Sequence, residues 1–548
     1  MMMNRPLIVQ GDRTLLLEVN HELYKQTRSA ILPFAELVKS PDYIHTYRIT
    51  PLSLWNAASL GMQDEQIIET LERYSKYPIP RMLVQEIKDT VSRFGKIMMR
   101  FENNDLLLVS EDDGSMEELL SYPSFARHIL RVVNPYTVAV PKQLRGLIKQ
   151  SLLKLGYPVR DLSGYSSGEP LDVTLNNEEG FTPRSYQIEA VDAFYAGGSV
   201  YGGNGVVVLP CGAGKTIVGI ETMARIKMDT LILTSNTTSV HQWRAEILKW
   251  TTLSPDQVGI YTGSEKEVCP VTISTYQMMT YKNASGEFPH LDLFHRRNWG
   301  LILYDEVHLL PAPVFRMTAD IQAKRRLGLT ATLVREDGRE EDVFSLIGPK
   351  KYELPWRILE EEGYIARASC TEIRLPLVGQ ERSRYMEAGE RQKFRIASEN
   401  SRKIPAVKNL LQRHAGEQVL IIGQYVSQME ELSHELGIPL ITGRTPNAER
   451  ETLYTQFRRG EISNLIVSRV ANFAVDLPDA SVAVQISGMF GSRQEEAQRL
   501  GRILRPKKTN QAYFYTLVSA GSTEETYALK RQMFLIEQGY SYKVVYEE

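Results

Sequence analysis

The chain has few cysteines, no long apolar run and almost no excess of charge of either sign. Its three cysteines, Cys211, Cys269 and Cys370, stand far apart without a C-x-x-C spacing, which excludes a four-cysteine zinc site or iron–sulfur cluster. No apolar stretch approaches the roughly 18 residues that span a bilayer. The apolar part of the N-terminus is too short for a secretion signal. We therefore expect a cytoplasmic protein without a membrane segment.

The near-neutral net charge bears on whether the protein binds nucleic acid. A net charge of −2 argues against a protein coated in basic residues. Nucleic-acid binding stays open, because a neutral protein can carry a positive groove. With 548 residues the chain exceeds the size of a single core, so several domains are expected. Nothing in the sequence indicates an oligomer, and a monomer is the default.

The most informative segment is an apolar run that ends in a glycine-rich turn, Val206-Val-Val-Leu-Pro-Cys-Gly-Ala-Gly-Lys-Thr216. Backbone N–H groups of such a turn surround phosphates, a lysine reaches the β and γ oxygens, and a hydroxyl ligates Mg²⁺. The general pattern G-x-x-x-x-G-K-[ST] has glycine where this chain has Leu209. The alternative is a glycine-rich turn without nucleotide. The predicted nucleotide-binding residues are Cys211, Gly212, Ala213, Gly214, Lys215 and Thr216, with Cys211 as a small packing residue.

Two carboxylates follow a second apolar run, in Gly300-Leu-Ile-Leu-Tyr-Asp-Glu-Val-His308. The C-terminal edge of a parallel sheet is where its ligand binds. We expect Asp305 to join Thr216 in holding Mg²⁺, and Glu306 to polarise the attacking water as general base. His308 could couple this pair to Gly328-Leu-Thr-Ala-Thr332, although small residues after a strand are also ordinary turn chemistry.

Further candidates lie on both sides of these motifs. In Gln498-Arg-Leu-Gly-Arg-Ile-Leu-Arg505, a helix would place Gln498, Arg502 and Arg505 on one face. Its two guanidinium groups could neutralise charge on a transferring phosphoryl group, or the segment could be the basic end of an amphipathic helix. Asp476 follows an apolar strand and could contact ribose hydroxyls. Upstream, Gln187 offers the amide that reads an adenine edge, with support from Arg184.

Two shorter polar segments also end apolar runs. Thr234-Ser-Asn-Thr237 and Thr275-Tyr-Gln277 suit contacts with phosphate and sugar, or they could be helix N-caps.

Two series of apolar runs alternate with helix-length segments, which predicts two α/β lobes with parallel sheets. The N-terminal part differs, with helices over residues 52–60, 64–74 and 82–94 and a hairpin over 96–110. This order resembles a winged helix, or a small structural α+β domain. Residues 380–403 are charge-dense and helical in pattern, either a protrusion that touches nucleic acid or a solvated helix. The predicted strands are 206–209, 230–234, 271–275, 301–304 and 326–330 in the first series, and 418–423, 439–442, 464–468, 481–487 and 512–518 in the second.

In this order and spacing, the motifs resemble a superfamily-two helicase from Phe181 to about Val518, a class whose phosphate loop commonly lacks the first glycine. Several elements are similar to the XPB family in particular: Asp305-Glu-Val-His308, Arg335-Glu336-Asp337, Val475-Asp-Leu-Pro478, Gln498 to Arg505, and the segment Ile44 to Trp55. The segment Ser468 to Phe473 departs from the usual glycine-containing motif, which puts its DNA contact in doubt.

The resemblance implies two tandem RecA-like lobes, over residues 171–360 and 361–548, behind an N-terminal α+β accessory region over 1–170. It also implies an ATP- and Mg²⁺-dependent motor that moves 3′→5′ on DNA and opens duplex, with a place in DNA repair and a nuclease or other repair protein as partner. Arg335, Glu336 and Asp337 would aid unwinding, and residues 380–403 would form a thumb-like grip. A duplex translocase that does not separate strands and an RNA-directed ATPase stay open as alternatives.

Overall fold

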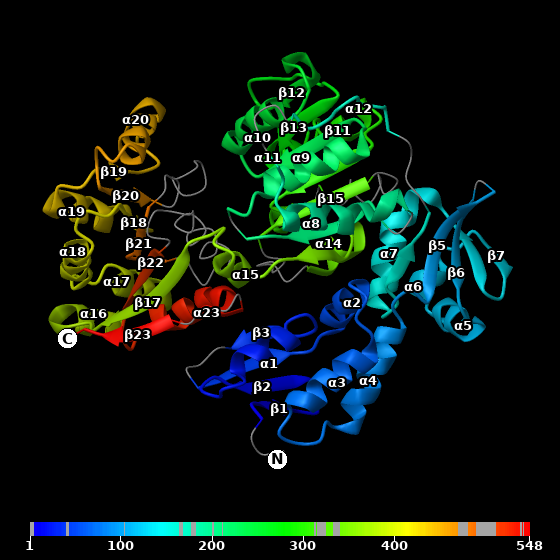
Figure 1. Cartoon of the computed structure of the whole chain (residues 1–548), viewed down its shortest axis with the longest axis horizontal. Coiled ribbons are helices and arrows are strands. Elements are labelled where there is room, and N and C mark those ends of the chain that lie inside the picture. Colours follow the sequence, from blue (N-terminus) through cyan, green and yellow to red (C-terminus); the bar gives the residue numbers. More distant parts are fainter. Residues whose placement is uncertain are drawn as a thin grey trace. The chain divides into compact units, whose positions relative to one another are not determined.

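The computed structural model describes residues 5–39, 43–103, 105–163, 168–176, 182–199, 202–210, 212–311, 314, 325–331, 340–468, 480–488, 511–537, 540 and 542–547. The chain forms two compact units, one of Met1–Leu209 with Gly214–Leu354 and one of Pro210–Ala213 with Pro355–Glu548 (Figure 1). Among the helices described, none is both long and apolar enough to cross a membrane. Several predicted site residues lie outside the described part, namely Cys211, Thr332, Arg335, Glu336, Asp337, Asp476, Gln498, Arg502 and Arg505.

The first unit begins with an antiparallel sheet in the order β1-β2-β4-β3. Alternation along β2 buries Leu15 and Leu17, which face the helices of this domain, because successive strand side chains point to opposite faces. In α3, Ile67 and Leu71 are buried at helical spacing. The elements are β1 (Leu7–Val9), β2 (Thr14–Glu18), α1 (Tyr24–Ile31), β3 (Glu36–Lys39), β4 (Ile44–Arg48), α2 (Pro51–Ser59), α3 (Asp64–Tyr74) and α4 (Arg81–Ser92).

A second small domain carries the predicted hairpin. Strands β5 (Ile97–Glu102) and β6 (Asp105–Ser110) pair antiparallel as the sequence predicts, and the three helices before them are α2, α3 and α4. The hairpin is not a two-stranded wing on those helices. It forms the centre of a five-stranded sheet, β7-β8-β6-β5-β9, with its own apolar core. The remaining elements are α5 (Asp113–Ser121), α6 (Pro123–Ala126), β7 (Arg131–Asn134), β8 (Thr137–Val140), η1 (Lys142–Leu144), α7 (Arg145–Lys154) and β9 (Val159–Asp161).

The two N-terminal domains pack on the end of the first lobe, within the same unit. The rings of Trp55 and Phe344 lie 6.5 Å apart, and Gln150 Nε2 donates to Asp342 Oδ1 at 3.0 Å. Ser59 Oγ also donates to the backbone carbonyl of Lys350 at 3.3 Å. The contacts therefore gather on α14 (Glu340–Leu346) and β16 (Lys350–Glu353), the last elements of the first lobe.

The first lobe is a seven-stranded parallel sheet in the order β12-β13-β11-β14-β15-β10-β16. Every strand predicted for it is present, and β12 and β16 were not predicted. Because all strands are parallel, their C-terminal ends share one edge. The strands are β10 (Asn204–Val208), β11 (Thr230–Thr234), β12 (Val258–Tyr261), β13 (Val271–Thr275), β14 (Leu301–Asp305), β15 (Arg325–Thr330) and β16; the helices are α8 (Ser185–Tyr195), η2 (Ala196–Gly198), α9 (Lys215–Ile226), α10 (Thr237–Trp250), η3 (Pro255–Gln257), α11 (Tyr276–Thr280), α12 (Leu293–Arg296), η4 (Val307–Leu309) and α14.

The second unit holds another seven-stranded parallel sheet, β19-β20-β18-β21-β22-β17-β23. The predicted strands are all present, while β17 and β23 were not predicted. Helices α18 and α19 cover it with buried residues such as Val407 and Met429. The strands are β17 (Arg367–Leu375), β18 (Val419–Gly423), β19 (Leu440–Ile441), β20 (Asn464–Ser468), β21 (Val482–Gln485), β22 (Gln511–Ser519) and β23 (Tyr542–Tyr546); the helices are α15 (Trp356–Glu361), α16 (Gly379–Glu387), α17 (Glu390–Ser398), α18 (Lys403–Arg413), α19 (Val426–Leu436), α20 (Asn447–Arg458) and α23 (Thr523–Glu537).

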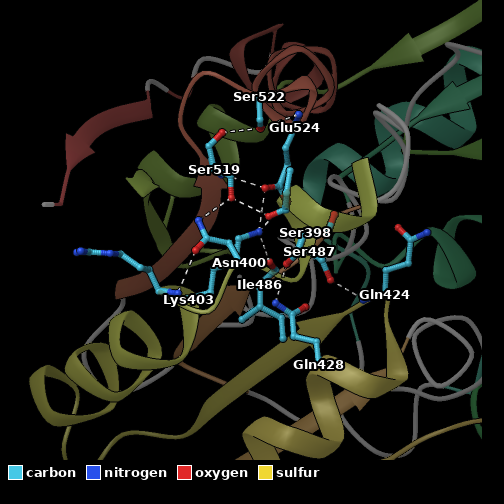
Figure 2. Close-up of polar contacts among 12 residues, drawn as sticks. Ser398, Asn400, Lys403, Gln424, Gln428, Ile486, Ser487, Ser519, Ser522 and Glu524 are labelled. Atoms are coloured by element: carbon cyan, nitrogen blue, oxygen red, sulfur yellow. Dashed lines mark hydrogen bonds and ion pairs between the residues drawn. The ribbon is translucent and has the colours of Figure 1, made fainter. Parts of the chain in front are cut away.

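The charge-dense residues 380–403 form two short helices, α16 and α17, and the first residue of α18. Arg382, Arg384 and Arg395 are exposed, whereas Lys403 is buried. Lys403 Nζ donates to both carboxylate oxygens of Glu524, at 2.8 and 2.9 Å, and to the carbonyl of Ile486 at 2.8 Å (Figure 2). Lys403 therefore belongs to the interior of the lobe and is not available to a polymer in solution.

Candidate active site

The phosphate loop joins β10 to α9, and two of its glycines have backbone conformations that other residues rarely adopt. Gly212 has φ = 81° and Gly214 has φ = 78°. A Cβ on Gly214 would lie 2.4 Å from Gln187 Nε2, so the site also leaves no room for a side chain. Helix α9 begins at Lys215, directly after this turn. The predicted strand, turn and helix are therefore present, and the N-terminus of a helix that follows a glycine turn is suited to bind phosphate.

The first two residues of α9 supply the polar side chains of the loop. Lys215 Nζ lies 3.4 Å from Glu306 Oε1, and 12% of the lysine side chain is exposed. Thr216 is half-buried at the next position. The structure thus brings the predicted lysine and the predicted general base together, from elements that are separated by about 90 residues in the sequence.

Glu306 has the left-handed backbone conformation, with φ = 52°, directly after β14. This conformation costs a residue other than glycine on the order of 1 kcal/mol, and it is found where a site requires a particular direction of the side chain. Its Oε1 faces Lys215, and its buried Oε2 accepts no hydrogen bond from the part of the chain that the structure describes. An unsatisfied carboxylate oxygen beside a lysine is suited to accept a hydrogen bond from a water molecule.

The pKa values of the two neighbouring carboxyl groups are shifted in opposite directions. Burial, followed by the negative charge of Glu306, raises the pKa of Asp305. Burial alone would also raise the pKa of Glu306, but the positive charges of Lys215 and of His308 outweigh it and lower that pKa. Glu306 therefore stays ionised near neutral pH, which is the state that a general base requires.

His308 links the carboxylate pair to the next strand. Its Nδ1 lies 2.7 Å from Thr330 Oγ1 and 3.5 Å from Glu306 Oε2. The sequence predicted that His308 couples the Asp-Glu pair to the segment Gly328 to Thr332, and the Thr330 contact is such a link. Thr332 lies outside the described residues.

Two residues that hold Asp305 were not predicted for that role. Trp243 Nε1 on α10 donates to Asp305 Oδ2 at 2.9 Å, and the Tyr276 hydroxyl on α11 donates to the Asp305 backbone carbonyl at 2.9 Å. Trp243 carries no local sequence signal, because its partner comes from a strand 62 residues away. Tyr276 lies in the segment Thr275 to Gln277, for which the sequence predicted contacts with sugar and phosphate and not support of Asp305.

The strand-end segments act as helix caps. Asn236 accepts a hydrogen bond from Ser239 N at 2.9 Å and caps α10, and Thr275 accepts one from Met278 N at 3.1 Å and caps α11. Of the two roles that the sequence allowed, the N-cap is the one that the structure contains. The cap side chains are thereby occupied.

Gln187 is buried on α8 beside the phosphate loop. Its Oε1 accepts a hydrogen bond from Arg184 N at 2.9 Å, and Arg184 donates to the Tyr186 hydroxyl at 2.9 Å. The amide nitrogen of Gln187 therefore lies against Gly214 of the phosphate loop. The amide oxygen is used in the cap of α8. Adenine recognition by this pair stays a prediction.

The residues at this edge fit a nucleotide with its metal. Helix α9 begins directly after the glycine turn, Lys215 Nζ lies 3.4 Å from Glu306 Oε1, and Asp305 is the last residue of β14. Hydroxyl and carboxylate oxygens are the ligands that Mg²⁺ prefers. The predicted phosphate and metal residues that the structure describes therefore lie on α9 and at the end of β14, and their role as one site for nucleotide and metal stays a prediction.

Known proteins with similar sequences cover the whole chain. The family described as ERCC3/RAD25/XPB C-terminal helicase matches residues 359–548, the type III restriction enzyme res subunit family matches 180–335, and a family described as helicase conserved C-terminal domain matches 7–134. A DNA 3′-5′ helicase XPB from Kineococcus radiotolerans is 53% identical over 99% of this chain and 97% of that chain. Its namesake from Mycobacterium tuberculosis is 52% identical over 99% and 98%.

A more distant relative is named as a general transcription and DNA repair factor IIH helicase/translocase subunit XPB. It comes from Encephalitozoon cuniculi and is 34% identical over 99% of this chain and 83% of that chain. Two parallel RecA-like sheets, with a phosphate loop and an Asp-Glu pair on the first, define a superfamily-two helicase. Within this class, the chain belongs to the XPB family.

Proposed function

We propose that this chain is an ATP-dependent DNA helicase that moves 3′→5′ and unwinds duplex, and that it acts in DNA repair in the cytoplasm. The observation that carries the ATPase part is the contact of Lys215 with Glu306 at 3.4 Å, with the second oxygen of Glu306 left for a water molecule. The names of the similar proteins support DNA as the polymer and the 3′→5′ direction.

In the proposed reaction, Lys215 neutralises charge on the terminal phosphate oxygens, and the backbone N–H groups of Gly212, Ala213 and Gly214 surround the phosphates. Glu306 accepts a proton from the attacking water. Thr216 and Asp305 would hold Mg²⁺, which neutralises charge on the phosphate oxygens when it is bound. Trp243 and Tyr276 keep Asp305 in place.

The other predicted residues complete the proposal. Arg502 and Arg505 would neutralise charge on the transferring phosphoryl group, with Gln498 on the same helix face, and Asp476 would contact the ribose. Arg184 and Gln187 would contact the base, and Arg335, Glu336 and Asp337 would aid strand separation. We further expect a nuclease or another repair protein as a partner and a monomeric chain.

The first experiment measures ATP hydrolysis without polymer and with single-stranded DNA, duplex DNA or RNA, for the native chain and for Glu306→Gln. We expect stimulation by DNA and a loss of at least about a hundredfold in the variant, because the amide cannot accept the proton. Stimulation by RNA alone would contradict DNA as the polymer. An unaffected Glu306→Gln enzyme would contradict the assignment of the base.

Two further assays distinguish a helicase from a duplex translocase. One measures displacement of a strand from a duplex, and the other measures displacement of a third strand from a triplex. Unwinding with 3′→5′ polarity is the expected outcome. Displacement of a third strand without separation of the duplex would instead support the translocase, an activity that appears in the name of the Encephalitozoon cuniculi relative.

A further inference from the structure

A group of aromatic and basic side chains lies at the C-terminal ends of β12 and β13, on the edge that also carries the ATPase residues. Strands β12 and β13 run parallel to β11 and β14, so their C-terminal ends share the edge of Asp305. Helix α11 starts at the end of β13, and its Tyr276 hydroxyl is bonded to the Asp305 carbonyl. Tyr281, the residue after α11, is thus part of a segment that is fixed to the ATPase strand.

Three rings lead from the interior of the lobe to its surface. Tyr261 is buried, and its hydroxyl lies 3.0 Å from His290 Nδ1. The half-buried His290 ring lies 5.7 Å from the ring of Tyr281, which is 56% exposed. Tyr281 differs from an isolated surface tyrosine in that its ring packs at a tilt of 41° against the His290 ring, which in turn is bonded to Tyr261.

The loop that carries these rings is held in place by its own hydrogen bonds. Asn283 Nδ2 donates to Glu287 Oε2 at 3.1 Å, and Glu287 N donates to Asn283 Oδ1 at 2.9 Å. Arg296 Nε donates to Asp292 Oδ2 at 3.0 Å. These bonds constrain the loop next to Tyr281, and a constrained loop loses less entropy on binding.

Cations lie beside the inner ring, Tyr261, and beside the ring of Phe288 in the same loop. Lys266 Nζ lies 4.7 Å and Arg296 Cζ 5.3 Å from the centre of the Tyr261 ring, and Lys282 Nζ lies 5.2 Å from the Phe288 ring. Burial and the nearby charge of Arg296 lower the pKa of Lys266, so the two cations repel each other. Lys266 and Lys282 are exposed, and neither has a carboxylate partner in the part of the chain that the structure describes. An anion at this position would relieve the repulsion.

We propose that Tyr281, supported by His290, is a stacking site for one base of single-stranded nucleic acid, with Lys266 and Lys282 contacting the flanking phosphates. An exposed ring beside exposed lysines is the combination that binds single strands without reading their sequence. The site rests on the proposed function, because the polymer is expected to be DNA. The site adds a contact to the bases. Asn236 and Thr275, which cap α10 and α11, provide no such contact.

The test is the affinity of the full-length chain for a fluorescent oligothymidylate and for an abasic strand of equal length. Tyr281→Ala should weaken binding of the oligothymidylate about tenfold and leave the abasic strand unaffected, because only stacking is removed. Tyr281→Phe should bind normally. Tyr77→Ala removes another exposed tyrosine and is the matched control.

The phosphate contacts are tested by the salt dependence of the same affinity. Lys266→Ala should reduce the slope of log affinity against log salt by about one, whereas Tyr281→Ala should leave the slope unchanged. Lys249→Ala, whose ammonium lies 4.2 Å from the Trp250 ring, is the matched control. Two results would overturn the stacking site. In one, Tyr281→Ala weakens binding of the abasic strand as much as binding of the oligothymidylate. In the other, Tyr281→Ala binds the oligothymidylate with native affinity. If the native chain itself binds no DNA, it is the proposed function that fails.

Discussion

Glu306 combines a strained backbone conformation with the chemical role that we propose for it. The left-handed backbone, with φ = 52°, directs the carboxylate toward Lys215 rather than along the strand. The sequence predicted the role of Glu306 from its place after an apolar run. It could not predict the backbone conformation, because the contacts that compensate for the strain come from β15 and α9.

At the residue scale, we predict that Trp243→Phe raises the Mg²⁺ concentration needed for half-maximal ATP hydrolysis by about ten- to a hundredfold. The indole N–H that orients Asp305 is lost, and mutation of such an outer partner has effects of this size. The measurement is a Mg²⁺ titration at saturating ATP. Trp250→Phe removes an indole N–H that binds Glu246, 2.6 Å away, and is the matched control. An equal effect in both variants would contradict a specific role for Trp243.

A second prediction at this scale concerns acid stability. Burial, and then the positive charge of Arg28, lower the pKa of His45 from 6.5 to about 4. The folded chain therefore binds a proton at His45 less readily than the unfolded chain. Its contribution to stability is complete above about pH 6.5 and is lost as the pH falls toward 4.

We expect this loss to be on the order of 1 kcal/mol at pH 5, and to disappear in His45→Gln. Thermal unfolding between pH 7.5 and pH 5 measures it. His434→Gln, at an exposed position on α19, serves as the control. If His45→Gln were destabilised by acid as much as the native chain, His45 would not be the titrating group.

At the scale of elements, a buried ion pair joins α18, α23 and the ends of β21 and β22. Besides Lys403, the Glu524 carboxylate accepts a hydrogen bond from Ser519 N at 2.9 Å, and Asn400 Nδ2 donates to Ser519 Oγ at 2.9 Å (Figure 2). The sequence grouped Lys403 with exposed basic residues, because its neighbours along the chain are charged. Its burial depends on Glu524, which follows 121 residues later.

We predict that Glu524→Gln lowers the free energy of unfolding of the second unit by about 3 kcal/mol, because the Lys403 charge stays buried without its partner. Chemical denaturation measures this loss. The double variant Lys403→Met with Glu524→Leu should regain most of it. Glu390→Gln removes a surface partner of Lys393, 3.8 Å away, and should cost less than about 1 kcal/mol. A double variant less stable than Glu524→Gln would contradict the explanation.

At the scale of the whole molecule, the N-terminal region and the first lobe form one unit. The sequence predicted them as separate domains, with a boundary near residue 170. Their junction depends on side chains such as Trp55 and Phe344, which lie far apart in the chain and carry no pattern that marks them as partners. The two units divide between Leu354 and Pro355, close to the boundary after residue 360 that the sequence predicted between the lobes.

We predict that Phe344→Ala uncouples these parts. The truncation removes a ring from the small apolar cluster with Trp55 and Leu153, and should cost about 3 kcal/mol. Hydrogen exchange should then be faster in α2 and α7 than in the central strand β11, whereas we expect similar protection of all three in the native chain. Unchanged protection of α2 and α7 would show that the junction does not depend on this ring. Phe457→Ala, in the second unit, should leave the exchange of α2 and α7 unchanged.

The sequence by itself determined the two parallel sheets and pointed to the residues proposed for ATP hydrolysis, because both depend on local patterns. Apolar runs of strand length predict buried strands, and Gly214, Lys215 and Glu306 act from the ends of such strands. Tertiary structure alone decided the support of the site by Trp243 and Tyr276, the burial of Lys403 and the docking of the N-terminal domains. Each of these requires two distant segments to meet, and periodicity along one segment carries no information about its partner.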